Sequence, residues 1–101
     1  MNNNALVSSS NFSYSITEVE ITPIKPREGL IAFASFVFNN AFYFSSIGIY
    51  TKIEGGYRLT YPTKLVGNRN LQIYHPISKD VSEAIEIAIF SKLNEIFGRI
   101  F

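Results

Sequence analysis

The residues of this chain that could take part in chemistry are few, and the most prominent of them are basic. Lys64 and Arg69 lie in a predicted loop, residues 63–70, which also holds Gly67 and two asparagines, and Arg58 lies upstream of it. Basic side chains around a flexible segment are typical of contacts to phosphate groups. Two interpretations remain open at this point: a phosphate-binding segment, or an ordinary solvated loop.

The charge is unevenly distributed along the chain, although its sum is small. The formal net charge of +1 at pH 7 indicates no overall electrostatic attraction to nucleic acid or to a membrane. Between residues 52 and 79, however, five basic residues stand against one acid, Glu54, which gives five minus one, a local excess of +4. This distribution favours a basic surface in the middle of the chain.

Catalytic and metal-binding sites find little support. The chain has one histidine, His75, and no cysteine, whereas a catalytic histidine needs a partner group and a metal ion needs several ligands. No acidic residue stands at ligand spacing from His75, and Gly67 lies outside any P-loop pattern. We therefore expect no enzymatic activity and no metal, and we interpret His75–Pro76 as a step that shapes the entry to a helix.

Residues 30–51 must organise the fold, because two apolar runs flank the pair Asn39–Asn40. Asparagine tolerates the positive φ of a tight two-residue turn, so the segment predicts a hairpin. That turn would pair Phe36 with Tyr43 and Ala32 with Ile47. One face would carry Leu30, Ala32, Ala34, Phe36, Phe38, Tyr43, Ile47 and Ile49, and the other Ile31, Phe33, Ser35, Val37, Phe42, Phe44, Ser46, Gly48 and Tyr50. Since neither face is polar, we predict a central hairpin covered on both sides.

The second of these faces carries three phenylalanines, Phe33, Phe42 and Phe44. Exposed aromatic rings on a sheet can stack on the bases of single-stranded nucleic acid. Here no basic residue shares the face with them, so we predict that they form a protein interface instead. Homodimerisation is the simplest cover for such an apolar face.

The flanking segments predict further strands. Residues 16–24 alternate between apolar and polar side chains, which indicates a half-exposed strand that Pro23 and Pro26 either confine to an edge or end. Tyr57–Tyr61 predicts a fourth strand, and residues 71–74 predict a short fifth one.

One helix follows the strands. Ser78 is expected to cap it, apolar residues recur along residues 81–97, and Gly98 is expected to end it. This order predicts an α+β fold in which an antiparallel sheet of four to five strands carries one C-terminal helix on one face. Ala32 and Ala34 would leave room for that helix.

The chain length of 101 residues suits one domain. We predict a flexible N-terminal tail at residues 1–14, from which Phe12 and Tyr14 could dock on the domain, and a single domain at residues 15–101. No apolar run approaches the about 20 residues of a membrane span, and the N-terminus has no signal-peptide pattern. We therefore expect a soluble, cytoplasmic protein without a membrane partner.

The order of these features resembles the stage V sporulation protein G (SpoVG) family of bacterial septation regulators. The resemblance extends from about Ile16 to Phe97. The residues that carry it are Ile16-Thr17-Glu18-Val19, Ala32, Ala34-Ser35, Phe42, Ile47, Ile49, Pro62-Thr63-Lys64 and Ile73-Tyr74-His75-Pro76-Ile77.

The resemblance implies a small homodimer that binds DNA, and in some members RNA, as a regulator of gene expression, septation or sporulation. It implies no catalysis, no cofactor and no small-molecule substrate. The binding determinants of the family lie in the basic segment that follows the Pro-x-Lys motif, here Pro62-Thr63-Lys64. The resemblance therefore assigns nucleic-acid contacts to Lys64 and Arg69. Leu65 stands where the family often has a basic residue, and Ile31 and Gly48 stand where arginine is typical. These departures favour an alternative function, a protein-interaction or assembly module on the same fold with little nucleic-acid binding.

Overall fold

The computed structural model describes residues 14–97 of the chain. The predictions made for residues 1–13 and for Gly98 therefore lie outside the described residues. The elements are β1 (Ile16–Arg27), β2 (Leu30–Phe38), β3 (Phe42–Thr51), β4 (Tyr57–Thr60), β5 (Thr63–Val66), β6 (Arg69–Gln72) and α1 (Lys79–Phe97).

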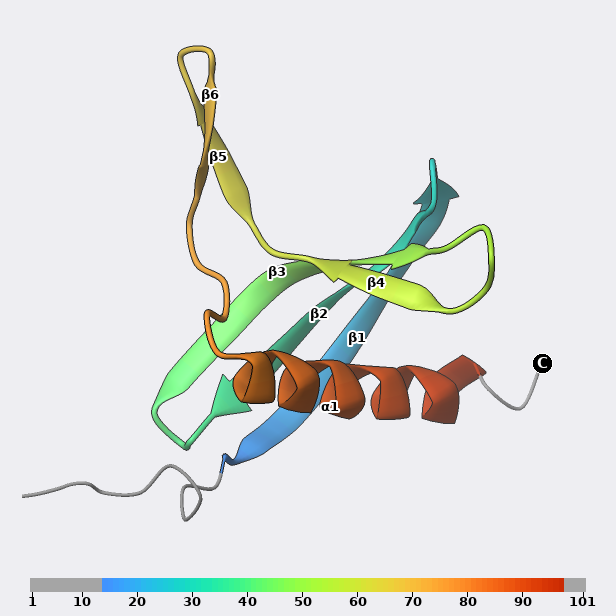
Figure 1. Cartoon of the computed structure of the whole chain (residues 1–101). Helices are drawn as coiled ribbons and strands as arrows, with labels where there is room; N and C mark the ends of the chain where they lie inside the picture. The colour runs from blue at the N-terminus through green and yellow to red at the C-terminus, as the bar shows by residue number, and fades with distance from the viewer. Residues whose placement is uncertain (1–13, 98–101) are drawn as a thin grey trace, which may run out of the picture.

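Two antiparallel sheets and one helix make up the fold. Strands β1-β2-β3-β4 form the large sheet in chain order, and β5 and β6 form a separate two-stranded sheet. Helix α1 lies across one face of the large sheet, and the β5–β6 pair projects away from it (Figure 1). The predicted α+β class, with one helix on one sheet face, is confirmed.

The core lies between α1 and the large sheet. The alanines of β2, Ala32 and Ala34, are buried in one cluster with Ile85, Ile89 and Leu93 of the helix. These helix residues recur every four positions and therefore lie on one side of α1. The small alanine side chains allow the helix to approach the sheet closely.

The start of α1 has the expected cap. The Ser78 hydroxyl accepts a hydrogen bond from the backbone N–H of Val81 at 3.3 Å, which satisfies one of the free donors of the first turn. Within residues 14–97 no helix is long and apolar enough to cross a bilayer.

The β2–β3 turn forms at the predicted residues. Asn39 and Asn40 have φ values of 52° and 53°, and the N–H of Ala41 donates to the Phe38 carbonyl at 2.9 Å. Ala41 then stays outside the ladder, and Phe38 pairs with Phe42. The pairing is thus one residue away from the predicted register.

A second irregularity moves the register further. Between the Ala34 and Phe36 pairs, β3 holds one extra residue, and Ser46 there has a positive φ of 65°. Phe36 pairs with Phe44 in the same register as Phe38 with Phe42, and the bulge then pairs Ala34 with Ile47. The predicted Phe36–Tyr43 and Ala32–Ile47 pairs are wrong, because a two-residue count cannot anticipate bulges that add residues to one strand.

The register decides which side chains share a face. Phe44 lies on the helix side of the sheet with Phe36, whereas Tyr43 points to the opposite side, which we call the outer face, and is 68% exposed. The bulge near the start of β2 likewise places Ile31 against the core. The predicted positions of Tyr43, Phe44 and Ile31 are therefore corrected.

Strand β1 continues through both prolines that could have ended it. Pro23 pairs with Ala32, and the strand reaches Arg27. Proline is tolerated there because β1 is an edge strand, where one row of N–H groups has no partner strand. A bulge with a positive φ at Glu18 also interrupts this edge.

Gly48 is required by close packing on the outer face. A Cβ atom at this position would lie 2.6 Å from the Thr60 hydroxyl and 3.3 Å from both Leu30 and Tyr50 side-chain carbons. We expect Gly48→Ala to lower the free energy of unfolding by about 1–3 kcal/mol, as overpacking usually does. Urea denaturation measures the change. In the Thr60→Ala background, where the hydroxyl at 2.6 Å is absent, Gly48→Ala should cost less than in the natural chain. An equal cost in both backgrounds would contradict the packing argument.

Candidate nucleic-acid interface

Residues 63–72 form a projecting two-stranded arm, built from β5 and β6. Gly67 and Asn68 make its two-residue turn, in which Gly67 has φ of 63°, as the first position of a type II′ turn requires. The N–H of Ile73 donates to the Pro62 carbonyl at 3.0 Å and closes the base of the arm. The prediction of a loop at residues 63–70 is therefore wrong.

The arm had a recognisable signal in the sequence. Two four-residue runs, Thr63–Val66 and Arg69–Gln72, flank a Gly-Asn pair, and this spacing is typical of a tight hairpin. The polar character of the runs concealed it, because neither has an apolar face that must be buried.

The arm brings Lys64 and Arg69 together. Lys64 pairs with Leu71, and Val66 pairs with Arg69. Directly paired residues share a face and successive residues alternate, so all four side chains lie on one face. Lys64 and Arg69 are diagonal neighbours, a relation in which the residues are typically about 7–8 Å apart. This spacing is suited to adjacent phosphates of one nucleic-acid strand.

The electrostatic surroundings of the arm are simple. All residues of β5 and β6 are exposed, and residues 63–72 include no acid. Within residues 14–97 the one ion pair is Lys92–Glu95, at 3.3 Å, which lies on the helix. Lys64 and Arg69 thus have no acidic partner in this part of the chain, so an incoming phosphate would not have to displace one.

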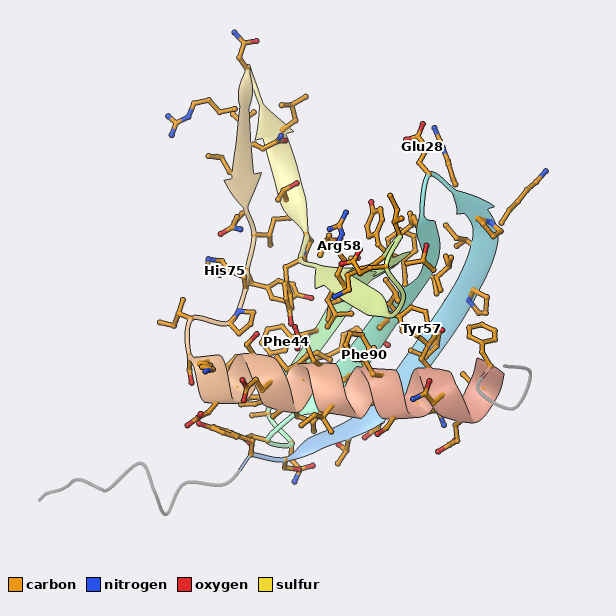
Figure 2. The ribbon with its side chains drawn as sticks, turned by 45° about the vertical axis from the view of Figure 1, so that its right-hand side comes forward. Glu28, Phe44, Tyr57, Arg58, His75 and Phe90 are labelled. Atoms are coloured by element: carbon orange, nitrogen blue, oxygen red, sulfur yellow. The ribbon has the colours of Figure 1, made fainter. Side chains whose placement is uncertain are left out.

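Arg58 lies elsewhere. It belongs to β4 and pairs with Tyr50 of β3, on the outer face of the large sheet. Its guanidinium carbon stacks over the Tyr50 ring at 4.5 Å from the centroid, a cation–π contact. Figure 2 shows Arg58 on the large sheet, below the arm. The structure therefore joins Lys64 with Arg69 but places Arg58 on a different surface.

The three phenylalanines of the predicted interface do not share one face. Phe33 lies on the outer face, where it is 39% exposed. Phe42 and Phe44 lie on the helix side and stack on each other at 5.8 Å between ring centroids. Phe42 is 61% exposed, whereas Phe44 is half-buried against Phe36 and Tyr74. A single patch made of all three is excluded by this register.

His75 lies in the segment that leads into α1, where the sequence placed it. Its side chain is exposed, and Nδ1 lies 3.2 Å from the Pro76 carbonyl. The preceding Tyr74 donates its hydroxyl to the Ser45 carbonyl and so ties the linker before α1 to β3. Among residues 14–97, no group of three or more histidines, cysteines and acids is placed to hold a metal ion.

Tyr61 makes the stability of the fold depend on pH in the alkaline range. Burial, with a smaller contribution from Glu86, raises the pKa of Tyr61 from 10.0 to about 12. In the unfolded chain the phenol ionises near pH 10, whereas in the folded chain it stays protonated longer. Ionisation therefore favours the unfolded state as the pH rises from about 10 to about 12.

We expect the free energy of unfolding to fall across this alkaline window, and Tyr61→Phe to reduce the fall. Urea denaturation at pH 9, 10 and 11 measures the slope. Part of the fall should persist in the variant, because burial also raises the pKa of Tyr74. Tyr50→Phe, on the outer face, is the matched control. A slope that Tyr61→Phe leaves unchanged would contradict the assignment.

Comparisons with known proteins agree with the resemblance seen in the sequence. The sequence profile of the SpoVG family matches residues 14–95. A relative from Finegoldia magna, whose name describes it as a septation protein SpoVG, is 37% identical over 85 residues, which cover 83% of this chain and 78% of the relative. The match includes the whole large sheet, the arm and most of α1. The chain therefore belongs to the SpoVG family.

Proposed function

We propose that the chain is a homodimeric nucleic-acid-binding regulator, which contacts phosphate groups through the basic face of the β5–β6 arm. The observation that carries the proposal is the placement of Lys64 and Arg69 on one exposed face without an acidic partner in the described residues. Two-stranded ribbons are known readers of nucleic-acid grooves. Arg58 supplies a third, separate cation on the outer face.

Self-association would double this weak set of contacts. Two phosphate contacts per chain give little affinity, because binding grows with the number of counterions released. The exposed rings of Phe33 and Phe42 are the candidate apolar contacts between chains, and Phe44 would act by supporting Phe42. Because Phe33 and Phe42 lie on opposite faces, a dimer would use one of them or wrap around the sheet.

The biological process is proposed from the family. The Finegoldia magna relative is named for septation, so control of septation or sporulation is the process we infer for this chain. Binding to DNA or RNA, rather than catalysis, is the activity that the arm supports.

A salt-titrated binding assay tests the function. Mixed pools of DNA and RNA are titrated with the full chain between about 50 and 200 mM salt, while light scattering measures the oligomeric state. A dimer with about four phosphate contacts should give a slope of log K against log salt near −3.6 on duplex DNA, since each contact contributes about −0.9. Salt-independent binding, or no binding to any pool at the lowest salt, would contradict the proposal.

A protein-interaction module is the second candidate. It is favoured by the apolar residues that the arm also exposes, Leu65, Val66 and Leu71. The same experiment separates the two functions, because a module of this kind would self-associate in the light-scattering measurement without retaining nucleic acid.

A further inference from the structure

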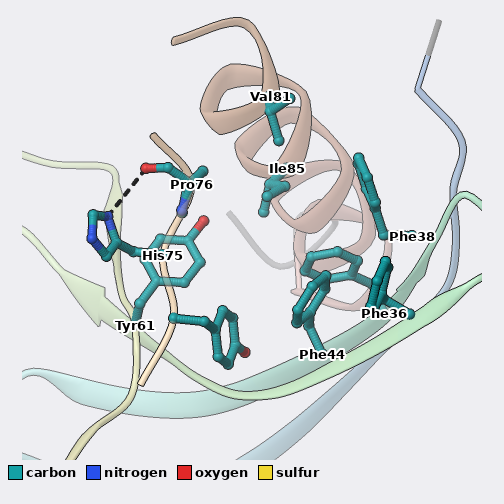
Figure 3. A pocket seen from close by; sticks show the side chains of 10 residues that line it. Phe36, Phe38, Phe44, Tyr61, His75, Pro76, Val81 and Ile85 are labelled. Atoms are coloured by element: carbon teal, nitrogen blue, oxygen red, sulfur yellow. Dashed lines mark hydrogen bonds between the residues drawn. The ribbon is translucent and has the colours of Figure 1, made fainter. Parts of the chain in front are cut away.

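An aromatic cavity opens between the end of the β2–β3 hairpin and the first turns of α1. Its volume is about 220 Å³. Figure 3 shows rings from the sheet on one side, and Val81 and Ile85 of the helix on the other. The lining consists of Phe36, Phe38, Phe42, Phe44, Tyr61, Tyr74, His75, Pro76, Val81 and Ile85.

The size and chemistry of the cavity suit one aromatic side chain. Sites for cofactors and drug-sized ligands usually occupy about 300–1,000 Å³, so this cavity is too small for most of them. No charged residue lines it except His75 when protonated. The Tyr61 hydroxyl is buried and has no hydrogen-bond partner among the described residues. A peptide segment would supply both a ring for the cavity and a carbonyl for that hydroxyl.

The beginning of the described chain is fixed beside this cavity. The N–H of Ser15 donates to Oδ1 of Asn39 at 2.8 Å, and the N–H of Asn39 donates to the Ser15 carbonyl at 2.7 Å. The Tyr14 ring stacks on Phe38 with 6.1 Å between centroids. Phe38 is itself a wall of the cavity, so the described chain begins next to the cavity.

We propose that the cavity is the docking site of the chain's own N-terminal segment, with the ring of Phe12 as the occupant. Phe12 is the one aromatic residue among residues 1–13, and these residues carry no charged side chain that would oppose burial in an apolar site. The hydroxyl of Tyr61 would be satisfied by a backbone carbonyl near Phe12.

The connection to Tyr14 makes this docking geometrically possible and favours it over capture from solution. The Tyr14 ring lies 6.1 Å from the ring of Phe38, which lines the cavity, and two residues of extended chain span about 7 Å, so the cavity is within reach of a phenylalanine two positions before Tyr14. A short connection gives an effective concentration in the millimolar range. The segment thus competes strongly with a separate chain at micromolar concentration.

Nuclear Overhauser effects (NOEs) in the full chain test the proposal. In uniformly ¹³C,¹⁵N-labelled protein we expect cross-peaks between the Phe12 ring and the methyl groups of Val81 and Ile85. Phe12→Ala should abolish these cross-peaks and shift both sets of methyl resonances. Leu6→Ala, a matched apolar truncation in the same segment, should leave the methyl resonances where they are.

The outcomes decide between occupants. An equimolar mixture of labelled and unlabelled protein shows whether the cross-peaks arise within one chain or between two. Cross-peaks only between chains would replace the proposal with a second copy as the occupant. The absence of any Phe12 cross-peak, or equal methyl shifts in Phe12→Ala and Leu6→Ala, would also overturn it. Since both substitutions lie before the first strand, neither is expected to unfold the domain.

Discussion

Replacing Lys64 and Arg69 together with alanine should lower the affinity for duplex DNA on the order of 10³-fold at about 0.1 M salt. The double substitution removes about four phosphate contacts from a dimer, and each contact contributes nearly tenfold at this salt concentration through counterion release. The slope of log K against log salt should fall toward zero at the same time. Fluorescence anisotropy with a labelled duplex measures both quantities.

The double variant Lys25→Ala/Arg27→Ala, which removes the same charge, is the matched control. Both residues are exposed on β1, outside the arm, so their replacement should leave the affinity nearly unchanged. Equal losses in the two double variants would indicate that binding depends only on the total charge of the protein. That result would remove the arm from the interface, even if the chain binds nucleic acid.

Phe36→Ala should lower the free energy of unfolding by about 3–5 kcal/mol, the usual cost of truncating a buried aromatic residue. Phe36 is 0% exposed in the core between the sheet and α1. Such a loss is a large part of the about 5–15 kcal/mol that stabilises a typical domain. Urea denaturation monitored by circular dichroism measures the change.

Phe33→Ala provides a control on the same strand. Phe33 is 39% exposed on the outer face, three residues before Phe36, so its truncation should cost much less, below about 1 kcal/mol in a monomer. A similar cost for both variants would show that the outer face is also covered, for example by a second chain. The concentration dependence of unfolding would then identify self-association.

Much of the fold follows from local patterns. The alternation in β1, the Asn-Asn turn and the capping serine before α1 each predicted a feature that the structure contains. Even the burial of Ala32 and Ala34 beneath the helix followed from their small size. These features are determined by residues that are close in the sequence, so sequence patterns predict them well.

The register could not be predicted in the same way. The unpaired Ala41 moved Phe44 to the helix side and Tyr43 to the outer face, and the bulge at Ser46 then placed Ile47 and Ile49 on the helix side with Ala34 and Ala32. Bulges depend on twist and on packing across the sheet, and a single residue of shift exchanges the two faces. The predicted interface of three phenylalanines failed as one surface for this reason.

The candidate site was predicted in part. The basic character of residues 63–70 was evident from the sequence. The structure adds that this segment belongs to a two-stranded arm, with Lys64 and Arg69 on one face. Arg58 is close in sequence but belongs to another sheet, where Tyr50 holds it. Only strand pairing decides which basic residues share a face.

The arm is also the part of the molecule that should open most easily. An isolated two-stranded hairpin is marginally stable in water, and all eight strand residues of the arm are exposed. Its amide hydrogens should therefore exchange through local opening, well before those of the large sheet. A ligand that needs the closed arm must offset this opening equilibrium. Substitutions at the Gly67–Asn68 turn would then change binding affinity without touching the ligand.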